Sequence, residues 1–116
     1  MIRITLLLVL SLLFSVSYAQ KAPLSVAFYN LENLFDTVDS PKPGDFDWTP
    51  GGGKAWDTER YQRKLNHLAY VIEKLDSDPE QPGHDILVIC EYENKTEVQD
   101  LIQTAPIDKA NYAIVH

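Results

Sequence analysis

The sequence has very few of the residues that build disulfides and zinc sites. Cys90 is the only cysteine among 116 residues, so no internal disulfide can form. It lies inside an apolar run, and we interpret it as a small core residue, because a reactive thiolate needs exposure and nearby positive charge. The three histidines, at positions 67, 84 and 116, do not have the spacing of zinc ligands. These absences exclude a disulfide-stapled scaffold and argue against a zinc centre.

Positive charge is also scarce. The chain has 10 Lys and Arg residues against 17 Asp and Glu residues, a formal net charge of -7 at pH 7. A surface this acidic repels nucleic acid unless cations or local basic patches intervene. A nucleic-acid substrate would therefore need one of these two aids.

The longest apolar run is too short for a membrane span. "ITLLLVLSLLFSV" follows Arg3, whereas a span requires roughly 20 apolar residues. Ser17 and Ala19 come next, with the small-x-small spacing that signal peptidase reads. We predict a secretory signal peptide over residues 1–19, and hence a secreted or periplasmic protein without a stable membrane anchor; a transmembrane anchor is the alternative. Residues 20–116 would then carry 9 basic and 17 acidic side chains, a formal charge of -8.

The remaining residues alternate between strand and helix patterns. "LSVAFYN" predicts a strand from Leu24 to Asn30 whose two faces are both apolar and suit burial. "DILVICE", residues 85–91, is an unbroken apolar run that predicts a central, parallel strand. "ANYAIVH", residues 110–116, predicts the start of a third strand. With helices between the strands, this order is typical of an α/β fold.

Two helices are predicted between these strands. The first starts at a cap formed by Asp57 or Thr58, and its apolar residues recur at helical spacing: Tyr61, Leu65, Leu68, Ala69, Ile72 and Leu75. The second is short and starts at Asn94, with Glu97 as its capping-box partner. Its inward side chains are Val98, Leu101 and Ile102.

A long loop, residues 36–56, separates the first strand from the first helix. It is rich in proline, glycine and aspartate, and loops of this length in compact domains are often functional. Its "PGGGK" segment is similar to a phosphate-binding loop but lacks a preceding strand and a Ser or Thr after Lys54, so we interpret it as a flexible turn. Trp48 and Trp56 either stack on a ligand or pack the loop down.

Polar side chains stand at the ends of the first two strands. Asn30 and Glu32 end the first strand, and Glu91 and Glu93 end the second. Residues two apart in an extended chain point the same way, and the carboxyl ends of parallel strands share one edge of the sheet. Grouped oxygen ligands of this kind suit Mg²⁺, Mn²⁺ or Ca²⁺. The ordinary alternative is that these acids cap helices or meet solvent.

Four segments together carry a family resemblance: "VAFYNLENLFDT", "DWTP", "RYQRKLNHLAYVI" and "DILVICEYEN". In this order they resemble the amino-terminal half of the endonuclease/exonuclease/phosphatase superfamily, in its secreted bacterial branch. The resemblance implies a four-layered α/β sandwich, with two sheets flanked by helices. It also implies metal-dependent hydrolysis of phosphodiester or phosphomonoester bonds, in nuclease or phosphodiesterase fashion.

The same resemblance assigns roles to individual residues. It implies that Asn30 is catalytic, holding the scissile phosphate and helping to bind the metal, and that Glu91 binds the catalytic divalent cation, with Mg²⁺ expected and Mn²⁺ or Ca²⁺ as substitutes. Glu93 would support these residues without binding the metal. The expected partner is a phosphodiester substrate, and DNA, RNA, a lipid head group and a small phosphate ester all stay open.

Members of the superfamily are longer and complete the site with a histidine, aspartates and a terminal Asp-His pair. We therefore expect residues 20–116 to form the incomplete N-terminal part of such a domain, inactive alone and with one apolar sheet face exposed. The second hypothesis is a secreted, non-catalytic binding or interaction domain of the same fold.

Overall fold

The computed structural model describes residues 23–41, 44–75 and 83–116. In chain order its elements are β1 (Val26–Leu34), the 3-10 turn η1 (Phe46–Trp48), α2 (Thr58–Leu75), β2 (Ile86–Tyr92), α3 (Lys95–Ile102) and the 3-10 turn η2 (Ile107–Ala110). The signal peptide predicted over residues 1–19 lies outside the described ranges and stays a prediction. Among the helices in those ranges, none has the length and apolar character needed to cross a membrane.

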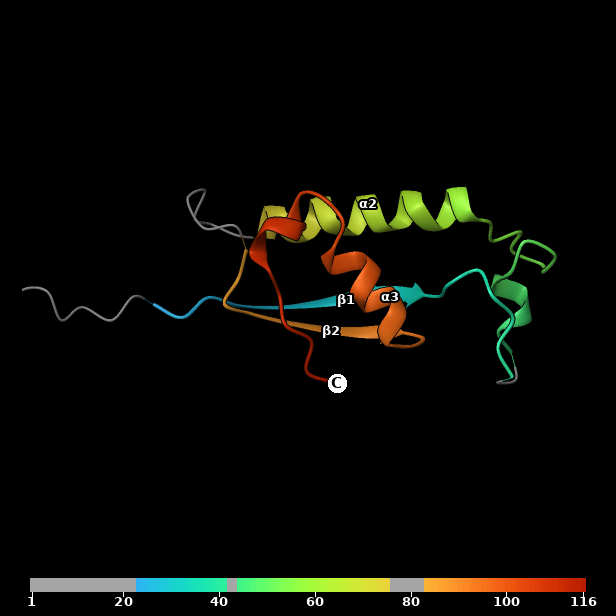
Figure 1. Cartoon of the computed structure of the whole chain (residues 1–116), viewed down its shortest axis with the longest axis horizontal. Coiled ribbons are helices and arrows are strands. Elements are labelled where there is room, and N and C mark those ends of the chain that lie inside the picture. Colours follow the sequence, from blue (N-terminus) through green and yellow to red (C-terminus); the bar gives the residue numbers. More distant parts are fainter. Residues whose placement is uncertain (1–22, 42–43, 76–82) are drawn as a thin grey trace, which may run out of the picture.

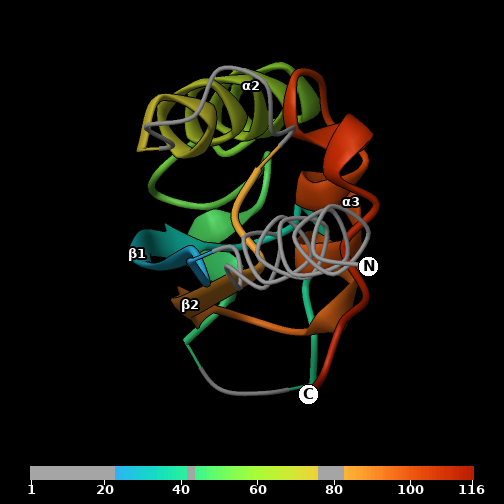
Figure 2. The same ribbon diagram turned by 90° about the vertical axis from the view of Figure 1, so that its left-hand side faces the viewer.

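β1 and β2 form a parallel two-stranded sheet, and α2 connects them. The register pairs Val26 with Ile86 and continues in step to Asn30, which pairs with Cys90. Figure 1 shows α2 running along the sheet in the direction opposite to the strands, and the view in Figure 2 shows it over one face with α3 beside the sheet. The predicted α/β class and the parallel pairing are thus confirmed.

The covered face of the sheet builds the hydrophobic core. Tyr29, Leu87 and Ile89 point to this face and pack against the buried cluster. The cluster joins β1, α2, α3 and η2 and consists of Leu31, Leu34, Tyr61, Leu65, Leu68, Ala69, Ile72, Leu101 and Ile107. Five of the six stripe residues predicted for the first helix are buried, whereas Leu75 at its end is 45% exposed.

The opposite face of the sheet is exposed in the described part of the chain. Val26 and Phe28 on β1 are 57% and 67% exposed, and their neighbours Ile86 and Val88 on β2 are each 45% exposed. The expectation that the first strand is buried on both faces is therefore not met here, because the helices cover one face only. An apolar face of this kind is the one that a second layer would cover.

The caps of both helices form as the sequence predicts. Asp57 Oδ1 accepts a hydrogen bond from Arg60 N at 2.9 Å, one turn into α2. Asn94 Oδ1 accepts from Thr96 N at 2.7 Å, while Glu97 Oε2 accepts from Asn94 N at 2.7 Å, which completes the capping box of α3.

The prediction that a third strand starts within residues 110–116 is wrong, because residues 111–116 form no strand. A groove of about 940 Å³ lies between this segment and β2, and residues of α3 also line it. The segment is instead held through its side chain at Tyr112, whose hydroxyl accepts a hydrogen bond from His84 N at 2.9 Å. The apolar pattern signalled an extended conformation, but pattern alone does not supply a paired edge.

Candidate functional site

A bulge ends β1 at the edge where the sequence predicts the site. Asn30 pairs with Cys90, and the next pair is Leu34 with Tyr92, so three residues of β1 stand opposite one residue of β2. Two of the three, Glu32 and Asn33, have left-handed backbones, with φ of 53° and 60°. Bulges and left-handed non-glycine residues cost free energy and cluster at functional sites, where they redirect side chains.

Asn30 holds this bulge with its side chain. Its Oδ1 accepts a hydrogen bond from Glu32 N at 2.7 Å. An amide oxygen has two lone pairs, so one acceptor position on Oδ1 and both N–H donors of the side chain are still available for a metal ion or a phosphate oxygen. The half-buried Asn30 is thus fixed in place by its own chain.

Glu91 lies directly across the sheet from this bulge. It follows Cys90, the pairing partner of Asn30, and its side chain is exposed. Its backbone is left-handed, with φ of 60°. Side chains two residues apart point the same way only where the backbone is extended. Because the backbone of Glu91 is left-handed, Glu91 and Glu93 need not point the same way.

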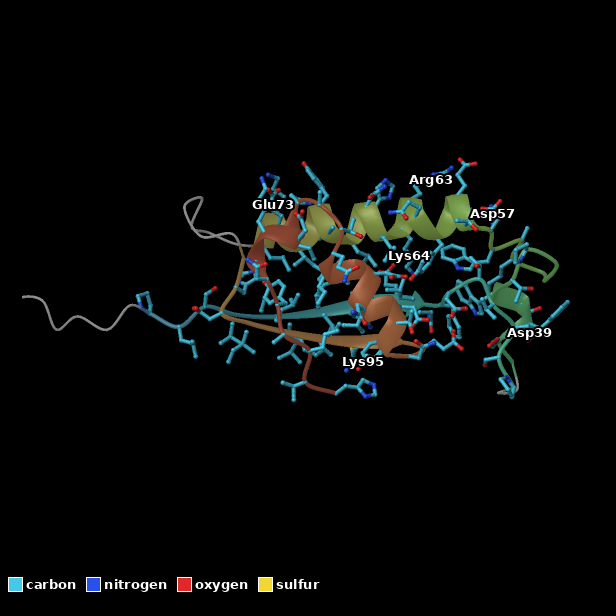
Figure 3. All side chains as sticks on the ribbon, in the orientation of Figure 1. Asp39, Asp57, Arg63, Lys64, Glu73 and Lys95 are labelled. Atoms are coloured by element: carbon cyan, nitrogen blue, oxygen red, sulfur yellow. The ribbon has the colours of Figure 1, made fainter. Side chains whose placement is uncertain are left out.

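Lys64 of α2 lies beside Glu32 and Glu91. Its Nζ donates to the carbonyl oxygens of Glu32 at 2.5 Å and Asn33 at 3.1 Å, the two left-handed residues of the bulge. Burial lowers the pKa of Lys64, and the negative charges of Glu32 and Glu91 oppose that shift. Figure 3 shows Lys64 on the strand side of α2 and Arg63 on the outer side. We call Glu32, Glu91 and Lys64 the lysine-side group.

Lys64 is not one of the apolar stripe residues predicted for the first helix. The available signal was its position: it lies three residues after Tyr61 and four before Leu68, both buried, so it flanks the stripe. A lysine there can lay its aliphatic stem on the core and bring its ammonium to the edge of the sheet.

Glu93 has different neighbours from Glu91. Its backbone N–H donates to Leu34 O at 3.0 Å, so it continues the contact between the two strand ends. Burial raises the pKa of the half-buried Glu93 carboxyl, and the nearby charges of Asp36 and Asp45 raise it further. The supporting role predicted for Glu93 stays a prediction, and its position assigns it to a second group of acids.

That second group, the buried acidic cluster, consists of Asp36, Glu93 and Glu97. One carboxylate oxygen from each lies within 4.8 Å of the other two. Glu97 is fully buried at 0% exposure, and burial raises the pKa of its carboxyl. Its Oε1 is buried without a hydrogen-bond partner, while Oε2 serves the capping box. Sequence reasoning gave Glu97 only the capping role and left Asp36 in an unpatterned loop.

The loop between β1 and α2 packs down through its aromatic residues. Trp48 stacks on Phe35 with ring centroids 4.8 Å apart and meets Trp56 edge-on at 5.5 Å. Trp56 Nε1 donates to Phe35 O at 3.0 Å, and Lys54 Nζ lies 4.4 Å from the centre of the Trp48 ring. The tryptophans therefore close the loop on itself, as the packing alternative predicts.

The glycine segment of the loop forms a turn. Gly52 N donates to Thr49 O at 3.1 Å, and Lys54 N donates to Asp47 O at 3.0 Å. These backbone groups are used within the loop and do not form a cradle for a phosphate. The predicted turn is confirmed.

The fold and its polar edge define a mixed α/β protein with acids and an amide gathered at the carboxyl ends of two parallel strands. The chain belongs to the Endonuclease/Exonuclease/phosphatase family, whose model matches residues 25–116. Members of this family generally use divalent metal ions, which agrees with the acidic character of the edge. Searches of curated proteins and of solved structures returned no significant match.

Proposed function

We propose that this chain provides the N-terminal part of a divalent-metal-dependent hydrolase that cleaves phosphodiester or phosphomonoester bonds. One observation carries the proposal besides the family: Asn30 is paired with the residue that precedes Glu91, at an edge where both strands leave regular geometry. Left-handed backbone at Glu32, Asn33 and Glu91 is costly, and a site that needs these side chains redirected gives a reason for it.

The two proposed ligands fit a hard divalent cation. Asn30 offers an amide oxygen and Glu91 an exposed carboxylate, and oxygen donors of this kind suit Mg²⁺. When bound, the ion would supply charge stabilisation for the transferring phosphoryl group. The amide N–H groups of Asn30 would orient a phosphate oxygen, and the positive charge of Lys64 would lie beside Glu91.

The wider architecture is part of the same proposal. A four-layered sandwich would place a second layer on the exposed face that Val26, Phe28, Ile86 and Val88 form. Residues 20–116 would be the N-terminal part of that domain, and the protein would be secreted or periplasmic after removal of residues 1–19. The substrate would be a phosphodiester, with nucleic acid as one candidate.

The test is hydrolysis by the protein expressed from its complete reading frame. DNA, RNA and a chromogenic phosphodiester are each incubated with metal-free protein, with and without added Mg²⁺. We expect activity that Mg²⁺ restores and that Glu91→Gln lowers by at least about 100-fold, since even outer residues of a metal site cost 10–100-fold. Asp39→Asn, a change at an exposed acid of the loop, serves as the matched control.

The outcomes separate the two hypotheses. Equal activity in wild type and Glu91→Gln would refute the metal-ligand role of Glu91. A protein that hydrolyses none of these substrates and shows no Glu91-dependent binding of Mg²⁺ in a calorimetric titration would support the non-catalytic binding domain instead.

A further inference from the structure

We propose that the buried acidic cluster, Asp36, Glu93 and Glu97, is a second cation site, selective for Ca²⁺ and separate from the site proposed at Asn30 and Glu91. The site would tie the loop after β1 to the junction between β2 and α3. It goes beyond the proposed function, because none of its three residues is a proposed ligand of the catalytic ion.

The first argument is the state of Glu97. Its side chain is fully buried, and Oε1 has no hydrogen-bond partner among the residues that the structure describes. Removing a carboxylate oxygen from water without a partner costs several kcal/mol in general, so proteins pair such groups or bind a cation to them. Glu97 is therefore a member of the acidic group that has one carboxylate oxygen still without a partner.

The second argument is geometry. The three ligand oxygens lie within 4.8 Å of one another. Ca²⁺ binds oxygen at about 2.3–2.6 Å, so oxygens on opposite sides of the ion are about 5 Å apart. The bound of 4.8 Å allows all three oxygens to share one ion. Ca²⁺ accepts irregular coordination by protein carboxylates, whereas Mg²⁺ demands a near-ideal octahedron and usually keeps several of its waters. Three acids brought together by separate segments therefore favour Ca²⁺.

The third argument is the charge around the cluster. Asp45, itself buried, adds a fourth acid close to Glu93. The ion pairs formed by described residues are Arg63 with Glu59 and Lys74 with Glu73, on the outer surface of α2. The cluster thus gathers acids from two distant parts of the chain. Neither of these two ion pairs includes a residue of the cluster, so neither neutralises its negative charge.

The position of the cluster gives the ion a role. Asp36 is the first residue of the loop that the tryptophans close, and Glu93 and Glu97 lie on either side of the first residue of α3. A shared ion would cross-link segments 57 residues apart in sequence, from Asp36 to Glu93, next to the strand end that carries Glu91. Such a link would fix the loop against the edge of the sheet.

The experiment measures Ca²⁺ binding to the protein expressed from its complete reading frame and freed of metal by a chelator. Calorimetric titration and melting curves are recorded with CaCl₂ and, separately, with MgCl₂. Glu97→Gln removes the charge but keeps an oxygen for the capping box. Asp36→Asn keeps the Oδ1 that accepts from Val38 N at 2.6 Å. Asp39→Asn makes the same change three residues away, at an exposed site, and is the control.

We expect Ca²⁺ at 100 times its dissociation constant to raise the melting temperature of the wild type by more than about 5 °C. The rise should be lost in Glu97→Gln and Asp36→Asn, and kept in Asp39→Asn and Glu91→Gln. A Ca²⁺ effect that survives Glu97→Gln, that disappears in Glu91→Gln, or that never occurs would overturn the second site. An equal Glu97-dependent rise with Mg²⁺ would overturn the choice of ion. Loss of hydrolysis without change in these results would concern the proposed function alone.

Discussion

Glu91 and Glu93 are two residues apart, yet they belong to groups with opposite surroundings. Glu91 is exposed and has Lys64 nearby, whose ammonium also holds the carbonyls of the bulge. Glu93 is half-buried and faces other acids, among them Asp36 and the fully buried Glu97. The lysine-side group has an internal positive charge, and the buried acidic cluster has none in its contacts among the described residues.

Because their surroundings differ, the two groups suit different kinds of ligand. An exposed carboxylate beside a lysine is stable without a metal ion and can admit a substrate from solvent. A buried group of acids is stable only if it takes up protons or a cation. Under the two proposals, one edge of a small sheet would offer a site open to substrate and a separate site for a structural ion.

The largest effect that separates the groups is on hydrolysis. Glu91→Gln should lower the Mg²⁺-dependent rate by at least about 100-fold, while Glu93→Gln, two residues on, should lower it less, by about 10-fold. Rates on a chromogenic phosphodiester, measured over a range of Mg²⁺ concentrations, give both values. If Glu93→Gln proved the more damaging change, the two groups would have to exchange roles.

The second effect concerns the loop that contains Asp36, one of the three residues of the buried acidic cluster. A Cβ at position 52 would lie 2.0 Å from Phe46 O and 2.7 Å from Asp47 Cα, both backbone atoms. Gly52→Ala should therefore open the turn and lower the free energy of unfolding by about 1–3 kcal/mol, as overpacking does elsewhere. Gly51→Ala, whose Cβ meets nothing within 4 Å, is the matched control.

The readout for this pair is denaturant unfolding together with Ca²⁺ titration. Because Asp36 belongs to the same loop, Gly52→Ala should weaken Ca²⁺ binding more than it weakens Mg²⁺-dependent hydrolysis. An equal loss of both properties would mean that the two groups do not act separately.

The third effect tests the lysine-side group. Lys64→Met removes the donor to Glu32 O and Asn33 O, and should lower the free energy of unfolding by about 1 kcal/mol, a value reduced by the partial exposure of the site. Mg²⁺ binding should tighten, because a positive charge beside Glu91 is gone. Arg63→Met is the control, since its 2.6 Å pair with Glu59 is on the surface. Weaker Mg²⁺ binding in Lys64→Met would contradict this.

Local patterns predicted the fold of this chain well. The helical stripe from Tyr61 to Ile72 is buried, and Asn94 and Glu97 form the capping box, because both depend only on spacing within one helix. The parallel pairing of the two strands follows from the unbroken apolar run of the second. The third strand failed because a strand needs a partner, and residues 111–116 lie across a groove from β2.

The site was predictable only in part. Its place, at the carboxyl edge of the sheet, follows from the strand order. The separation of Glu91 from Glu93 does not, because it depends on one left-handed residue that no periodicity reveals. The buried acidic cluster joins Asp36 to residues near the other end of the chain, and such convergence is a property of the packed fold.

The smallest effect is the pH dependence of stability without divalent cations. Burial raises the pKa of Glu97 above its ordinary value of 4.5, and the charges of Asp36 and Glu93 act in the same direction. The folded protein therefore holds a proton at Glu97 more tightly than the unfolded chain does. Stability should rise as the pH falls from neutrality through the raised pKa, and the gain should be complete below the ordinary value.

Denaturant midpoints between pH 5 and 8, in the presence of a chelator, measure this dependence. Glu97→Gln should be more stable than the wild type at neutral pH and should show a smaller rise on acidification. The difference between the two proteins removes the contribution of the three histidines and of Tyr61, whose pKa is raised by burial and by Asp100 and which stays protonated throughout. With saturating Ca²⁺, the stability of the wild type should instead fall as the pH falls, because the ion binds the ionised carboxylates. Glu97→Gln should not show this reversal. Identical pH profiles for the two proteins would show that the charge on Glu97 does not affect the free energy of unfolding. The contrast between the buried acidic cluster and the lysine-side group would then be refuted.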